Sequence, residues 1–197
     1  HKEQFILKRL TYKKCKSMND SNNISIDKDI KNARTMPSKY YTNQIYFDLT
    51  IKNIFSNSWQ FIFKKSNLNN NNIYPFTFLK DSINEPLLLT NKNDNLNILS
   101  NVCTHRGNLL CIKQTKKNKI ICGYHGRVFD LKGKVNQAPG FEKTNNFPNK
   151  ADCLKNFQIK EWKDFLFCSL NNTVDINHVL IDIEKRLDSF PFEKLIY

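Results

Sequence analysis

The chain has 197 residues, of which 40% are hydrophobic and 12% aromatic, and its formal net charge is +13. That apolar content suffices for one ordinary domain with a core and excludes a wholly disordered chain. A basic chain can serve nucleic acid, a membrane surface or an acidic partner, but only five of its 31 basic residues are arginine. Because arginine is the main reader of base edges, we predict no nucleic-acid function and attribute the charge mainly to a compositional bias toward Lys, Asn and Ile.

Membrane and secretion signals are also absent from the sequence pattern. No apolar run reaches the roughly 18 residues that a membrane span needs, and the basic first segment lacks the apolar centre of a signal peptide. The six cysteines have no regular spacing outside one motif. We therefore expect a chain without a membrane partner or disulfide framework, in a reducing, cytoplasmic compartment.

The first 56 residues divide into two parts. Residues 1–17 carry no turn signals and are interpreted as an extension of no assigned function, since Met18 would make a natural start. Residues 18–56 form a predicted N-terminal arm, polar and extended to about residue 45. Apolar residues at 47, 51, 54 and 55 then predict a short amphipathic helix.

From residue 57 to 173 the pattern changes to short apolar runs between Asp, Asn and Ser turns, which is typical of a small antiparallel β-sandwich or barrel. The predicted strands cover 59–63, 75–79, 87–89, 96–99, 119–121, 127–130, 157–162 and 165–170. Residues 131–134 predict a hairpin turn. Residues 174–197 have helical spacing, which Phe190-Pro191 ends.

Two loops hold the residues that carry chemistry. The first is Cys103-Thr104-His105-Arg106-Gly107, and the second is Cys122-Gly123-Tyr124-His125-Gly126. Sixteen residues, 106–121, separate His105 from Cys122. Each loop offers one thiolate and one imidazole, and three of the five glycines of the chain lie in these loops, where the backbone can closely approach a bound group.

These four side chains suit a Rieske [2Fe–2S] cluster, which keeps two Cys on one iron and two His on the other. Two alternatives stay open from the residues alone. Two Cys and two His can form a tetrahedral zinc site, although zinc ligand pairs usually match within each half. The four residues can also be core thiols and surface imidazoles that share no ligand.

At these residues the sequence resembles the Rieske non-haem iron oxygenases, specifically the α subunits of the aromatic ring-hydroxylating dioxygenases and the choline monooxygenase-like enzymes. The likeness covers roughly residues 25–197 and includes the 129–134 hairpin. It implies that Cys103, His105, Cys122 and His125 bind the cluster. It also implies that the loops are supported by Arg106, Gly107, Tyr124, Gly126 and Pro139, the last in a proline segment, 138–141, that covers the cluster.

Two departures from the family pattern matter. Arg127 stands where many members have Trp. Rieske proteins of respiratory complexes carry an extra Cys in each loop, and the matching second-loop position here is Tyr124, which disfavours that branch.

The family's catalytic domain contains a mononuclear Fe(II) held by two His and one carboxylate. Besides the two candidate ligands, the chain has only His1 and His178, and neither lies in the family's motif for that site. We therefore expect a mainly β Rieske domain with a short N-terminal helical arm, followed by the helical start, 174–197, of an α+β catalytic domain that this chain lacks.

The resemblance implies an oxidoreductase subunit that passes electrons from a ferredoxin or flavin reductase, through the cluster, to that mononuclear iron. The full-length protein is then expected to form a homo-oligomer resembling a trimer. The alternative is a stand-alone Rieske ferredoxin-type electron carrier. A two-His, one-carboxylate iron site encoded downstream would exclude this alternative.

Overall fold

The computed structural model describes residues 26–171, 174–187 and 189–194. Contacts divide the chain into two units, His1–Thr42 and Asn43–Tyr197. The described part of the first unit contains one short helix, α1 (Lys39–Thr42), which buries no residue. The expected extended arm is therefore wrong for these four residues, whereas residues 1–17 lie outside the described part.

The second unit begins with helix α2 (Gln44–Asn53), which starts three residues earlier than the predicted helix. The cause is Asn43, whose side chain caps the helix by accepting a hydrogen bond from the backbone N–H of Ile45 at 2.9 Å. Only Ile51 is buried along α2. The predicted short helix is confirmed, and a 3₁₀ turn, η1 (Phe55–Asn57), leads from it into the sheet.

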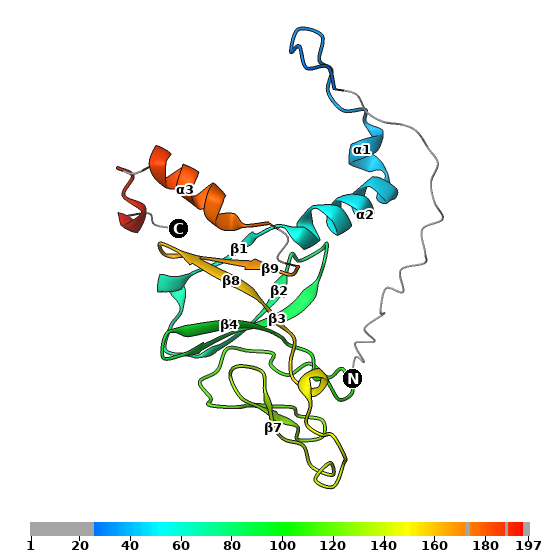
Figure 1. Ribbon diagram of the computed structural model, residues 1–197, viewed down its shortest axis with the longest axis vertical. Helices are drawn as coiled ribbons and strands as arrows, with labels where there is room; N and C mark the ends of the chain where they lie inside the picture. The colour runs from blue at the N-terminus through cyan, green and yellow to red at the C-terminus, as the bar shows by residue number, and fades with distance from the viewer. Residues whose placement is uncertain (1–25, 172–173, 188, 195–197) are drawn as a thin grey trace. The chain divides into compact units, whose positions relative to one another are not determined.

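The strands form two antiparallel sheets (Figure 1). In spatial order the six-stranded sheet consists of β1 (Gln60–Lys64), β9 (Phe165–Ser169), β8 (Asn156–Trp162), β4 (Asn95–Ser100), β3 (Glu85–Lys92) and β2 (Ile73–Phe78). The smaller sheet consists of β5 (Ile120–Ile121), β6 (Val128–Phe129) and β7 (Val135–Gln137). The predicted mainly β, antiparallel fold is confirmed, and β7 is the one strand that the sequence analysis missed among the described residues.

Strands β2, β3 and β4 are buried on both faces, so that adjacent residues enter different cores. In β3, Leu87 and Leu89 pack with Phe157 and Leu166 inside the six-stranded sheet. Leu88 faces the other way and joins a second core that contains Cys103, Cys122 and, from the smaller sheet, Ile120, Phe129 and Val135. The candidate ligand thiols are therefore part of a hydrophobic core that the large sheet supports from one side.

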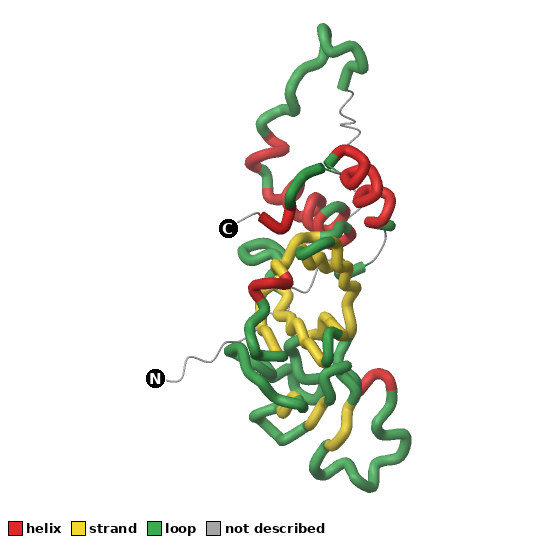
Figure 2. The backbone as a smooth tube through the Cα atoms, turned by 90° about the vertical axis from the view of Figure 1, so that its left-hand side faces the viewer, coloured by secondary structure: helices red, strands yellow, loops and turns green. Residues whose placement is uncertain are grey.

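The part of the chain around the smaller sheet is mostly loop, with short strands (Figure 2). One buried polar contact ties it to the large sheet: the hydroxyl of Thr90 in β3 donates to the carbonyl of Leu131 at 2.7 Å. Leu131 begins the predicted hairpin, whose Gly133 has φ +84°. The loops are therefore held by packing and hydrogen bonds more than by strand pairing.

The C-terminal segment contains helix α3 (Ile176–Arg186), which buries Ile176 and Leu180. Asp175 caps it by accepting from the backbone N–H of Asn177 at 2.9 Å. Short 3₁₀ turns elsewhere are η2 (Lys65–Asn67), η3 (Lys150–Asp152) and η4 (Phe192–Lys194). In the described part of the chain, no helix has the length and apolar character required to span a membrane.

Candidate metal centre

The two candidate loops have the same backbone geometry. In the first loop, the N–H of Gly107 donates to the carbonyl of Cys103 at 3.0 Å, and in the second the N–H of Gly126 donates to Cys122 at 3.1 Å. Both glycines have positive φ, +69° and +72°, which residues with a Cβ rarely adopt. Each cysteine N–H, in turn, donates to the carbonyl five residues ahead. The two loops are thus equivalent turns, each of which presents one cysteine and one histidine.

The loops bring like side chains together. The Cys103 and Cys122 thiols are buried, with 2% and 3% exposure, and lie within hydrogen-bonding reach of each other. The rings of His105 and His125 lie nearer to solvent, with centroids 4.8 Å apart. The site therefore has two thiols on the inside and two imidazoles on the outside.

Hydrogen bonds distinguish the two thiols. Burial raises the pKa of Cys103 above that of an ordinary thiol. Burial acts in the same direction on Cys122, but hydrogen bonds from the backbone N–H groups of Tyr124 and His125 outweigh it and hold the pKa of Cys122 below the usual value. The amide of Asn108 contributes, with its Nδ2 at 3.7 Å from the Cys122 sulfur. The second loop is therefore arranged to stabilise sulfur in the thiolate form, which is the form that binds metal.

The His105 imidazole is also kept in the neutral form that a ligand requires. Desolvation, and then the positive charges of His125, Arg127 and Arg106, lower the pKa of His105. A neutral imidazole binds metal, whereas a protonated one cannot. The edge of Phe141 contacts the His105 ring at a centroid distance of 5.5 Å, and the Tyr124 ring lies 3.7 Å from that of His125, tilted by 31°. Both candidate imidazoles are thus oriented by aromatic neighbours.

The remaining predicted support residues also lie at the site. Pro139 is next to Gly126, where an added Cβ would meet the proline Cγ at 3.5 Å. Arg106 is exposed. The role of these residues stays a prediction.

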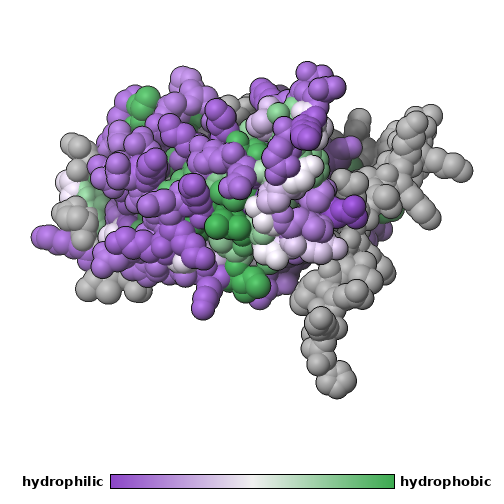
Figure 3. All heavy atoms as spheres, turned by 90° about the horizontal axis from the view of Figure 1, so that it is seen from below, coloured by the Kyte–Doolittle hydropathy of each residue, from purple (hydrophilic) through white to green (hydrophobic). Residues whose placement is uncertain are grey.

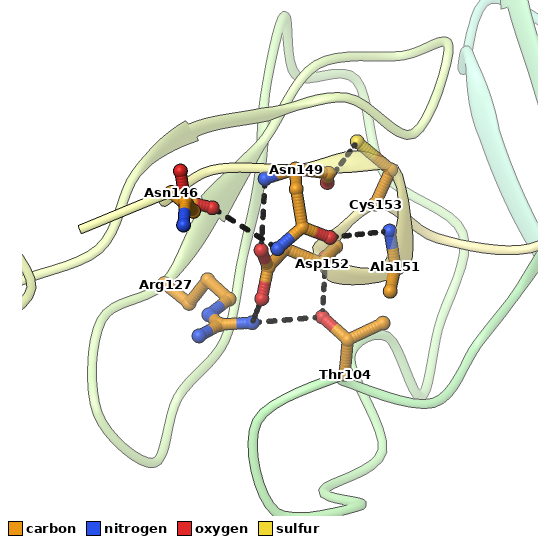
Figure 4. A network of polar contacts seen from close by, with 7 residues as sticks. All are labelled: Thr104, Arg127, Asn146, Asn149, Ala151, Asp152 and Cys153. Carbon is orange, nitrogen blue, oxygen red and sulfur yellow. Dashed lines mark hydrogen bonds and ion pairs between the residues drawn. The ribbon is translucent and has the colours of Figure 1, made fainter. Parts of the chain in front are cut away.

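The sequence analysis missed several neighbours of the loops. It gave no role to Asn108, to Thr104, or to Asp152 on the distant turn η3. No local pattern marks them, because the contacts Thr104–Asp152 and Asn108–Cys122 join segments that are far apart in the chain. A polar network connects Thr104 and Asp152 with Arg127 (Figure 4).

The grouping of the donors fits a two-iron cluster better than a single zinc ion. Zinc needs its ligands around one point, whereas here the two thiols pair on the inside and the two imidazoles pair on the outside. A pair of thiols beside a pair of imidazoles matches the division of ligands between the two irons of a Rieske cluster. His178, one of the two histidines outside the loops, is 89% exposed on α3, whereas His1 lies outside the described residues.

Comparison with known proteins identifies the family. Residues 58–148 match the Rieske [2Fe–2S] domain. Over 141 residues the chain is 33% identical to the carnitine monooxygenase oxygenase subunit of Escherichia coli K12, covering 71% of this chain and 37% of that protein. This chain contains a Rieske [2Fe–2S] domain. Over 147 residues the chain is also 31% identical to the chloroplastic choline monooxygenase of Beta vulgaris. The matched segment covers 75% of this chain and 32% of that protein.

Solved structures of Rieske oxygenases share the fold. The apo form of the quaternary ammonium Rieske monooxygenase CntA matches with a TM-score of 0.70 and 26% identity, over 80% of this chain and 46% of that one. Naphthalene 1,2-dioxygenase from Rhodococcus sp. matches with a TM-score of 0.64 at 20% identity, which shows the likeness of fold alone. The chain spans about a third of the length of the monooxygenase subunits above, 32% and 37%.

Proposed function

We propose that this Rieske domain binds a [2Fe–2S] cluster through Cys103 and Cys122 on one iron and His105 and His125 on the other. The observation that carries the proposal is the pairing of buried thiols and outer imidazoles by two equivalent turns. When bound, the cluster supplies one-electron transfer at a potential above that of all-cysteine clusters. The part of the chain that holds it has three tasks: to present thiolates, to hold the two imidazoles side by side, and to exclude water from the sulfurs.

The proposed residues suit these tasks. Backbone N–H groups of the second loop stabilise sulfur at Cys122, and burial of both thiols keeps water away from them. The outer histidines lie closer to solvent, where an electron can enter or leave through the imidazole side. Exposed apolar side chains lie near this end of the domain, among them Tyr124 at 60% and Leu109 at 41% exposure. The view from below shows apolar surface bordered by hydrophilic surface on this face (Figure 3).

In the whole protein we propose that this domain passes electrons from a ferredoxin or flavin reductase to a mononuclear iron, which oxygenates an organic substrate. In the same proposal the whole protein forms an oligomer resembling a trimer, and this chain spans about a third of the length of its monooxygenase relatives. Relatives named for choline, carnitine and glycine betaine favour a quaternary ammonium substrate. A match to the α subunit of toluate 1,2-dioxygenase leaves an aromatic acid as the second candidate. We propose a cytoplasmic location, where the five described free cysteines would stay reduced.

Metal and sulfide analysis of anaerobically purified protein tests the cluster. The expected result is a red-brown protein with about two iron atoms and two acid-labile sulfides per chain. Stoichiometric zinc without sulfide would overturn the proposal. To test the oxygenase role, the gene can be read beyond the codon for Tyr197, where a two-His, one-carboxylate motif is expected. Its absence would favour a stand-alone electron carrier.

A further inference from the structure

A buried arginine lies beside the proposed cluster without a full set of partners. Arg127, which follows the second loop, is 3% exposed. Its Nη1 donates to the hydroxyl of Thr104 at 3.0 Å, but its Nε has no hydrogen-bond partner among the described residues. Burial of a charge is costly unless the charge is paired and hydrogen-bonded, so the position of this guanidinium needs an explanation.

The charge of Arg127 is only loosely balanced. The nearest carboxylate is that of Asp152, with 3.8 Å between Arg127 Nη1 and Asp152 Oδ1. The other oxygen of Asp152 accepts from the backbone N–H of Asn149 at 2.9 Å and so caps the turn η3. A bidentate Arg–carboxylate pair would be shorter on two contacts. The Asp152 carboxylate, drawn beside Arg127 in Figure 4, therefore offsets the Arg127 charge only in part.

Two aromatic rings pack against Arg127, and one of them also contacts a proposed ligand. Its guanidinium carbon lies 5.2 Å from the ring centroids of both Phe141 and Phe147, and Phe141 contacts His105 with its edge. The positive charge of Arg127 acts to lower the pKa of both Cys103 and His105, so it is felt at one proposed thiolate ligand and one proposed imidazole ligand. In a medium of low effective dielectric, such a charge acts more strongly than one at the surface.

We propose that Arg127 is a positioning residue that sets the reduction potential of the cluster, its buried positive charge favouring the reduced state. The inference rests on the proposed function, since it requires the cluster. Uptake of one electron from a reductant converts one ferric iron to ferrous, adds one negative charge, and forms or breaks no bond. A nearby cation stabilises that added charge, and a nearby anion opposes it.

The test is the potential of the loaded protein, measured by EPR-monitored titration with dithionite. In Arg127→Gln, which keeps a donor for Thr104 but removes the charge, the equilibrium constant for reduction should fall at least tenfold, about 59 mV for a one-electron couple. In Arg127→Lys the positive charge remains, so the reduction potential should lie closer to that of the wild type than to that of Arg127→Gln. A purely structural role would make the two variants alike. Equal potentials in Arg127→Gln and Arg127→Lys would therefore overturn the proposal.

Asp152→Asn should shift the reduction potential in the opposite direction from Arg127→Gln. The substitution keeps an acceptor for the turn η3 but removes the anion that offsets Arg127, so reduction should become at least threefold more favourable, ~28 mV from the same constant. Because Asp152 is no proposed ligand, this variant decides the matter even where Arg127 variants fail to hold a cluster. A potential that is unchanged or lower in Asp152→Asn would overturn the inference.

A matched surface control separates buried charge from total charge. Lys52 is exposed on α2, and Lys52→Gln removes one positive charge that water and salt screen. Its potential should equal that of the wild type, and a shift as large as in Arg127→Gln would contradict a local effect. Failure of the wild-type chain to bind any cluster would overturn the proposed function instead, so the two failures are distinguishable.

Discussion

Replacement of Gly133 by alanine should destabilise the domain through both its backbone and its core. Gly133 has φ +84°, a conformation that costs an L-residue about 1–2 kcal/mol. Its new Cβ would lie 3.1 Å from Leu154 Cβ, 3.1 Å from Leu99 Cδ2 and 3.3 Å from the Leu154 carbonyl oxygen. Both leucines are buried in the core that contains the candidate thiols, where overpacking costs about 1–3 kcal/mol.

Gly140 supplies the matched control. Its φ is +82°, nearly that of Gly133, but nothing lies within 4 Å of an added Cβ. Gly140→Ala should therefore lose only the backbone part, about 1–2 kcal/mol, whereas Gly133→Ala should lose about 2–5 kcal/mol when overpacking is added. For a chain of this size each kcal/mol corresponds to roughly 2–4 °C in Tm.

Calorimetry of the oxidised, cluster-loaded variants under anaerobic conditions is the assay, with visible absorbance as the check on loading. Gly133→Ala should melt at least about 2 °C below Gly140→Ala, from the smallest expected difference of about 1 kcal/mol. Equal melting temperatures would refute the reasoning, because they would mean that Leu99 and Leu154 can move aside without cost.

Three further outcomes are expected. Thr90→Val should lower the free energy of unfolding by about 1 kcal/mol, since it removes the buried hydrogen bond to Leu131; a denaturant titration measures this, and an unchanged midpoint contradicts it. Cys122→Ser should abolish the cluster absorbance, whereas Cys168→Ser, at a buried thiol of the other core, should retain it; retention in both would remove Cys122 from the ligand set. The chain alone, reduced and exposed to ¹⁸O₂ with choline or toluate, should yield no labelled organic product, since dioxygen activation needs an iron with open coordination positions; a labelled product would reveal an iron site that the sequence analysis missed.

Strands were predictable where apolar runs are long enough to mark them. The run Leu87–Leu89 predicted a strand, but not which core each residue enters, because both faces of β3 are covered and the usual alternation is missing. Strand β7 (Val135–Gln137) was missed because it has three residues and buries only Val135. The extended arm failed at Lys39–Thr42, a four-residue helix without a buried side chain to mark it.

At the candidate site, too, local features could be predicted from the sequence and long-range contacts could not. Equivalent turns at 103–107 and 122–126 follow from local spacing and from Gly107 and Gly126, so their shared geometry could be anticipated. The environment of Arg127 could not, because its partners come from residues 104, 141, 147 and 152, which only the folded chain brings together. Long-range polar contacts leave no periodic signal in a single sequence.

The central claim is that two histidines and two cysteines share the cluster, and pulsed EPR of the reduced protein tests it most directly. The protein is produced with ¹⁵N-histidine and compared with its ¹⁴N counterpart. Two strongly coupled histidine nitrogens are predicted in the wild type, and one in His125→Cys. A spectrum without histidine nitrogen coupling, or one that His125→Cys leaves unchanged, would contradict the assignment.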